Sequence, residues 1–161
     1  MGKIKKFSAL NIRKISGGKD PIKIVQNFIM RRGFDPTDCL KEKTPNHVRW
    51  MLSISEEEDL EILIEGLKIP SETTVYMGVN IATVPIRNAQ DVLITALEVA
   101  DGLVGIKVSL VGHFLILSAS MGLSGLTVED LDYHYRLIIA QQSWFRESLV
   151  EELGWENLPD E

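Results

Sequence analysis

TTVYMGVNIATVP (residues 73–85) is typical of a β-strand, because Val75, Met77 and Val79 alternate with other residues and Pro85 ends the run. An amphipathic helix is expected from Asn88 to about residue 105. IKVSLVGHFLILSAS (106–120) then predicts two short strands around a tight turn at Gly112. The helix should lie on the sheet through one apolar face: Ala89, Val92, Leu93, Ala96, Leu97, Ala100 and Leu103.

The segments on either side extend this pattern. HVRWMLSI (47–54) and LEILIE (60–65) both alternate with a period of two, which predicts two more strands of an antiparallel sheet. A first helix is expected from Asp20 to Gly33, and residues 34–44 are expected to be irregular. The last helix begins in a capping-box-like sequence at Thr127 and continues to Leu153. The element order α-βββ-α-ββ-α predicts an α+β domain with helices packed against an antiparallel sheet.

The 161 residues suit a single domain that needs no disulfide. We expect a basic N-terminal segment (1–18) that is flexible, an α+β domain (19–155) and an acidic C-terminal tail (156–161). Cys39 is the only cysteine, which fits a reducing, cytoplasmic location. Residues 108–126 are apolar, but they contain three Gly and four Ser, so a buried hairpin is favoured over a membrane helix.

Charge is distributed unevenly around a net value of −6. Residues 1–19 contain six basic residues and no acidic one, whereas the remainder contains 11 basic and 23 acidic residues. An acidic body repels nucleic-acid phosphates, so nucleic-acid binding would have to depend on the basic segment alone. That segment could instead contact an anionic partner or fold back on the acidic body, and a solvated tail is the simplest interpretation.

No catalytic motif is present: the sequence lacks a P-loop, a dinucleotide fingerprint, a nucleophile elbow and a His-Glu-x-x-His motif. Asp130 and His134 have i, i+4 spacing, but no third metal ligand is evident. The acidic run 56–59 lacks the spaced ligands of a calcium loop and suits a solvated turn. We therefore expect no catalytic residue, no metal and no cofactor.

The aromatic residues point instead to contacts with other proteins. Trp144, Phe145 and Trp155 crowd the end of the last helix, where Trp is favoured both in cores and at interfaces. Tyr76, Met77 and Val79 on the strand 73–82 are further candidates. Arg87 at the corner between this strand and the next helix either pairs with Asp91 or contacts a partner. The candidate partner-binding residues are Tyr76, Met77, Val79, Arg87, Trp144, Phe145 and Trp155.

The order of elements resembles the fold of the type III secretion chaperones and of the YbjN family. The local likeness to YbjN-type proteins is carried by VNIATVPIR (79–87), by residues 91–105 and by IKVSL (106–110). With the flanking strands and the last helix, the resemblance covers residues 20–153 and leaves the first 19 residues outside. The resemblance implies a regulator without a catalytic residue, and the secretion chaperones that share this fold dimerise and bind extended segments of effectors.

The sequence thus predicts a non-enzymatic, cytoplasmic module that binds a protein or peptide and forms a homodimer. Recognition would use an exposed sheet edge and a groove bordered by helices. The alternative is a small-molecule sensor or cryptic enzyme with a pocket between helix and sheet near His47, Arg87 or His113. Nucleic-acid binding through the basic segment is the third hypothesis. We expect no membrane partner.

Overall fold

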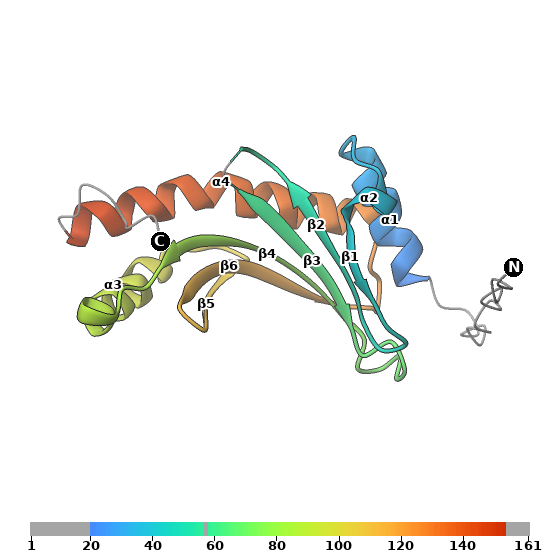
Figure 1. Ribbon diagram of the computed structural model, residues 1–161, viewed down its shortest axis with the longest axis horizontal. Coiled ribbons are helices and arrows are strands. Elements are labelled where there is room, and N and C mark those ends of the chain that lie inside the picture. Colours follow the sequence, from blue (N-terminus) through green and yellow to red (C-terminus); the bar gives the residue numbers. More distant parts are fainter. Residues whose placement is uncertain (1–19, 57, 154–161) are drawn as a thin grey trace, which may run out of the picture.

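Six antiparallel strands form a single sheet in the order β1-β2-β3-β4-β6-β5 (Figure 1). The computed structural model describes residues 20–56 and 58–153. The helices are α1 (Pro21–Arg31), α2 (Pro36–Cys39), the 3-10 turn η1 (Ile86–Asn88), α3 (Ala89–Ala100) and α4 (Val128–Leu153). The strands are β1 (Leu40–Lys43), β2 (Val48–Ser53), β3 (Asp59–Glu65), β4 (Thr74–Thr83), β5 (Lys107–Val111) and β6 (Phe114–Gly122). The predicted α+β fold class with an antiparallel sheet is confirmed.

The core lies on one face of the sheet. Strand register places Trp50, Ile62, Met77 and Ala119 in one row across β2, β3, β4 and β6, and all four are buried. The long helix α4 contacts β4 and β6, and α1 packs beside α4 (Figure 1). Alternation in the strands therefore gives one apolar face, which these helices remove from water.

Helices α1 and α4 begin as their sequences predict. The carboxylate of Asp20 accepts a hydrogen bond from the Ile22 amide at 3.0 Å, so Asp20 caps α1. At the start of α4 the Asp130 amide donates to Thr127 Oγ1 at 3.1 Å, and the Thr127 amide donates to Asp130 Oδ2 at 2.8 Å. This reciprocal pair is a capping box with Asp in place of Glu.

Two parts of the fold differ from the sequence prediction. Residues 34–44 are not irregular, because they form α2 and β1. Asp35 caps α2 by accepting a hydrogen bond from the Thr37 amide at 2.7 Å. All four residues of β1 are exposed, so this strand carries no apolar alternation from which it could be predicted.

Helix α3 does not lie on the sheet through its whole apolar face. It contacts α4 and β5, and only Val92 and Ala96 within it are buried. Leu97, which the sequence places on the packing face, is 70% exposed. The helix is also preceded by η1, and Asn88 at its N-cap position makes no capping hydrogen bond through its side chain.

Replacing Thr127 with Ala should lower the free energy of unfolding by about 1 kcal/mol, because the first turn of α4 loses its side-chain cap. Urea denaturation followed by circular dichroism measures this loss. Ser124→Ala, an exposed position just before α4, is the matched control and should change stability by less than about 0.5 kcal/mol. Equal losses in the two variants would show that the cap is unimportant.

Candidate partner-binding surface

The two edges of the sheet differ in how well they are protected against pairing with another chain. The β1 edge is short, contains a register shift between Leu40 and Glu42, and carries Lys41 and Lys43. Short length, irregularity and lysine are the devices by which proteins prevent an edge from adding strands. The β5 edge lacks a register shift and has only Lys107 as a charged residue. The β5 edge is therefore the more open of the two.

The pairing of β5 with β6 determines which β5 backbone groups remain free. Val111 and Phe114 flank the two-residue turn, and Gly112 in this turn has a φ of 61°. In a hairpin with such a turn the flanking residues form a hydrogen-bonded pair, and alternate pairs are hydrogen-bonded after it. The amides and carbonyls of Val108 and Leu110 therefore point outward, toward the free side of the strand. An extended segment could pair with them.

Exposed apolar side chains are present on the elements around this open edge. They come from α3, from the loop between α3 and β5, from the β5–β6 hairpin and from α4, and α3 lies beside β5 at one end of the molecule (Figure 1). We call them the α3–β5 surface: Ile94, Leu97, Val104, Leu110, Val111, Phe114 and Trp144, all exposed by 43% or more. The register places Leu110 on the core face of β5 and Val111 and Phe114 on the opposite face, so apolar side chains flank the free edge on both faces of the sheet.

Helix α4 holds this surface in place. Gln141 uses both ends of its amide on one backbone unit: Nε2 donates to the Val104 carbonyl and Oε1 accepts from the Val104 amide, both at 3.1 Å. One turn away on either side, Trp144 and Leu137 pack against Gly102 and Gly105. A Cβ atom at Gly102 would lie 2.8 Å from Trp144 Cη2, so the loop can approach α4 this closely only without a side chain.

The structure distributes the predicted partner-binding residues between the core and two parts of the surface. Met77 and Phe145 are 0% exposed and Val79 is 1% exposed, so these three support the core, and a partner of the closed domain cannot touch them. Trp144 belongs to the α3–β5 surface. Arg87 is exposed at the start of α3, and it forms no ion pair with Asp91 or with any other described residue. Trp155 lies outside the described residues.

Tyr76 lies on the opposite face of the sheet from the core. Its ring covers Gly78, at which a Cβ atom would stand 2.3 Å from the Tyr76 hydroxyl. Burial raises the pKa of Tyr76, and interaction of its hydroxyl with Ser118 opposes that rise. Burial is the larger of the two effects, so the pKa of Tyr76 is raised on balance. The ring fills a notch that glycine leaves in a central strand.

Sequence reasoning missed most of the α3–β5 surface. Ile94 lies outside the apolar face assigned to α3, and Leu97 was assigned to packing on the sheet. The available signal was that α3 is apolar on more than one side, which a helix packed through one face does not need. Leu110 and Phe114 were treated as strand residues of a buried hairpin, although an edge strand exposes part of both faces.

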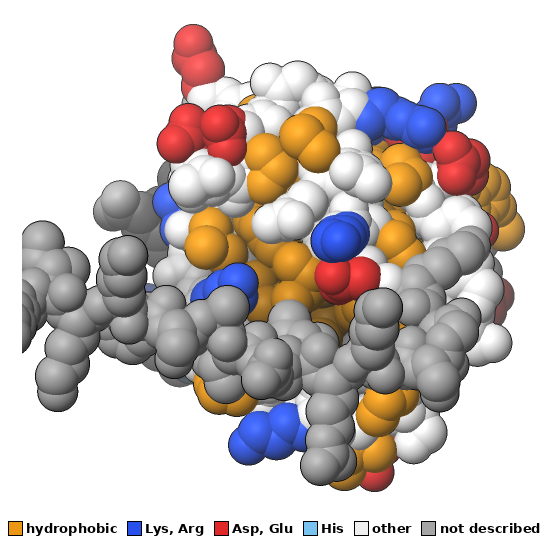
Figure 2. Space-filling model, turned by 90° about the vertical axis from the view of Figure 1, so that its right-hand side faces the viewer, with side chains coloured by type: hydrophobic (Ala, Val, Ile, Leu, Met, Phe, Trp, Pro, Cys, Tyr) orange, Lys and Arg blue, Asp and Glu red, His pale blue; other side chains and the backbone are white. Residues whose placement is uncertain are grey.

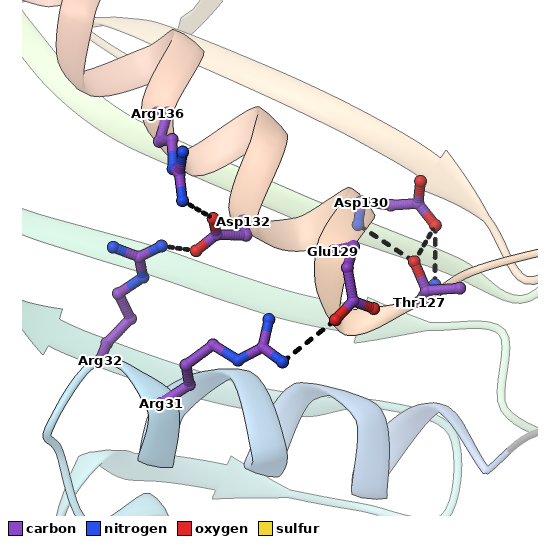
Figure 3. A network of polar contacts seen from close by, with 7 residues as sticks. All are labelled: Arg31, Arg32, Thr127, Glu129, Asp130, Asp132 and Arg136. Carbon is purple, nitrogen blue, oxygen red and sulfur yellow. Dashed lines mark hydrogen bonds and ion pairs between the residues drawn. The ribbon is translucent and has the colours of Figure 1, made fainter.

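The other end of the molecule is fixed by charged groups that join α1 to α4 (Figure 3). The Asp132 carboxylate lies between Arg32 and Arg136, at 2.6 Å from Arg136, and Arg31 pairs with Glu129 at 3.0 Å. The pKa of Glu129 is lowered, first by a hydrogen bond from its own backbone amide and then by Arg31. Figure 2 shows this end, where hydrophobic side chains are interspersed with Lys, Arg and acidic ones. This network serves the docking of α1.

The groups considered for catalysis or metal binding do not form a site. His47 pairs with Glu42 at 3.0 Å in the β1–β2 hairpin, at the opposite edge of the sheet from His113 at the β5–β6 turn, so the histidines do not converge. Burial, followed by Asp38, raises the pKa of Cys39, which disfavours its thiolate. Within residues 20–56 and 58–153, no three His, Cys, Asp or Glu side chains are placed to hold a metal ion. In the same residues no helix has the length and apolar character needed to cross a membrane.

Comparisons with known proteins show similarity at the level of the fold. No family model and no curated protein matches the sequence. A chain of the ExsC–ExsE complex is 9% identical with a TM-score of 0.55, over 80% of this chain and 92% of that one. The Yersinia pestis type III secretion chaperone SycH, solved with a fragment of YscM2, is 10% identical with a TM-score of 0.53, over 76% of this chain and 97% of that one. An uncharacterized protein from Methanothermobacter thermautotrophicus is 9% identical with a TM-score of 0.57, over 81% and 96%.

These likenesses confirm the predicted type III secretion chaperone-like fold. The resemblance to the YbjN family stays a prediction, because none of the matched structures is described as a YbjN protein.

The neighbours Trp144 and Phe145 should respond differently to truncation. Phe145→Ala removes a fully buried ring and should lower the free energy of unfolding by about 3–5 kcal/mol. Trp144→Ala should cost less, about 1–2 kcal/mol, because the ring is 43% exposed and touches mainly the loop at Gly102. Urea denaturation measures both losses. A larger loss for Trp144→Ala would mean that this side chain serves stability rather than an exposed surface.

Proposed function

We propose that this protein is a non-enzymatic, chaperone-like adaptor that binds an extended segment of a partner protein at the β5 edge. The observation that carries the proposal is the combination of free backbone groups at Val108 and Leu110 with exposed apolar side chains on both sides of them. Strand addition obtains its affinity from main-chain hydrogen bonds, and adjacent apolar side chains supply contact area and specificity. The α3–β5 surface offers both.

The similar solved structures support a protein partner. SycH was solved with a fragment of YscM2, and ExsC with ExsE, so this fold holds another polypeptide in both complexes. A regulatory role of the YbjN type and a cytoplasmic location are the finer parts of the proposal. They rest on the local sequence likeness at residues 79–110 and on the single cysteine.

A homodimer is also part of the proposal. The apolar side chains of the α3–β5 surface are unfavourable in water, and a second copy of the chain can cover them when no other partner is present. A partner segment and a second copy would then compete for the same end of the molecule. Self-association should therefore weaken when a partner binds.

Panning the full chain against a phage library of random 12-residue peptides should select binders. Their binding should protect the Val108 and Leu110 amides from hydrogen exchange, because a strand added at β5 bonds to these groups. Leu110→Pro should weaken binding of the selected peptides by tenfold or more, since proline removes one outward amide.

Leu110→Ala is the matched control, because it shortens the same side chain and keeps the amide. It should lose clearly less affinity than Leu110→Pro, because it loses side-chain contact only. Failure to enrich any peptide over a support without protein would refute the proposal, and so would equal losses in the two variants.

A further inference from the structure

The end of the molecule that carries the α3–β5 surface is acidic. Helix α3 contains no Lys or Arg, and it holds exposed carboxylates on the same side as Ile94 and Leu97. The last turns of α4 add further exposed carboxylates to this end (Figure 1). Arg87, Lys107 and Arg146 are the basic residues of this end, and Arg146 is already paired with Glu58. They stand against six acidic residues: Asp91, Glu98, Asp101, Glu147, Glu151 and Glu152. A ligand that fits both the apolar and the charged groups is a basic segment with apolar side chains.

The chain contains such a segment in its first 19 residues. It combines six basic residues with no acidic one, and apolar residues recur through it at Ile4, Phe7, Leu10, Ile12 and Ile15. Asn11, between Leu10 and Ile12, completes a short alternation suited to strand addition. The segment therefore combines basic and apolar side chains, which complement the acidic and apolar side chains at the α3–β5 surface.

The position of the segment favours binding to a different copy of the chain. Helix α1, to which the segment is joined, lies at the end of the molecule opposite α3, and α4 spans the distance between them (Figure 1). The 26 residues of α4 are about 39 Å long. About 12 residues of extended chain are needed to cover that distance, so roughly seven would remain for contact within one molecule. When two chains pack side by side in opposite directions, the segment of each chain starts near the α3–β5 surface of the other. Few of its residues are then needed to cover the distance.

We propose that residues 1–19 of one chain bind the α3–β5 surface of a second copy, and that the exchange is reciprocal. The inference rests on the proposed function, because it assigns a ligand to the same surface. It also makes the segment a built-in competitor: a partner segment has to displace it, and the dimer comes apart when this happens. Reciprocal exchange gives the closed two-fold symmetry that most homodimers have.

Photo-crosslinking tests the assignment on the full chain. A benzophenone amino acid is placed at position 97, where Leu97 is 70% exposed, and this protein is mixed with an equal amount of ¹⁵N-labelled protein. After irradiation, mass spectrometry should find position 97 joined to peptides from residues 1–19, with unlabelled and labelled peptides in the same product. The same group at position 133, where Tyr133 is 57% exposed on the first part of α4, is the control and should give no product that joins it to residues 1–19 of a second copy.

Every other result overturns the inference. Products joined only within one chain would show that the segment folds back on its own body. Products joined to another part of a second copy would show a different dimer, and absence of a product with residues 1–19 would show that they do not bind here. If selected peptides still protect the β5 amides in these cases, the proposed function stands and the inference alone fails.

A charge exchange provides an independent test. Glu98→Lys with Asp101→Lys should weaken self-association roughly fivefold at low salt, and so should Lys3→Glu with Lys5→Glu. Both α3 sites are near the C-terminal end of the helix, where lysine is favourable, so folding should be unaffected. The protein carrying all four changes should recover most of the affinity in analytical ultracentrifugation. No recovery would contradict direct pairing between the segment and α3.

Discussion

The contact between α4 and the apolar face of the sheet supports the rest of the structure. The sheet has one face of buried side chains, and without a cover this face would be exposed to water. Because α4 is long, it crosses the core strands, meets α1 near its beginning and meets α3 farther along. Both ends of the molecule are therefore placed relative to one straight element, with ion pairs at the α1 end and the Gln141 amide at the α3 end.

The parts of the fold that were predictable are those in which burial imposes a period. Strands β2, β3 and β4 alternate because one face is buried, and α1 and α4 carry recognisable caps. β1 was not predictable, because all four of its residues are exposed and the strand therefore shows no alternation of apolar and polar side chains. Leu97 is apolar, but the identity of a residue does not show whether it covers the sheet or faces solvent.

The candidate site was harder to predict than the fold, for the same reason. Met77, Val79 and Phe145 are buried, because in a single domain most large apolar residues are needed for the core. A binding surface becomes visible only when the core is complete and some apolar residues remain outside it. Trp144 shows both roles, since one side of its ring supports the loop at Gly102 and the other side stays exposed. The sequence alone could not show that the Trp144 side chain both contacts the loop and remains partly exposed.

The ring of Tyr76 over Gly78 links two positions that are not adjacent in the sequence. No side chain larger than that of glycine fits at position 78 while the ring occupies its present place, and without the ring the glycine would leave a bare notch in a central strand. The two positions are therefore expected to change together: in related chains, a substitution at one should be accompanied by a substitution at the other. An alignment of related chains guided by the structure would show this covariation.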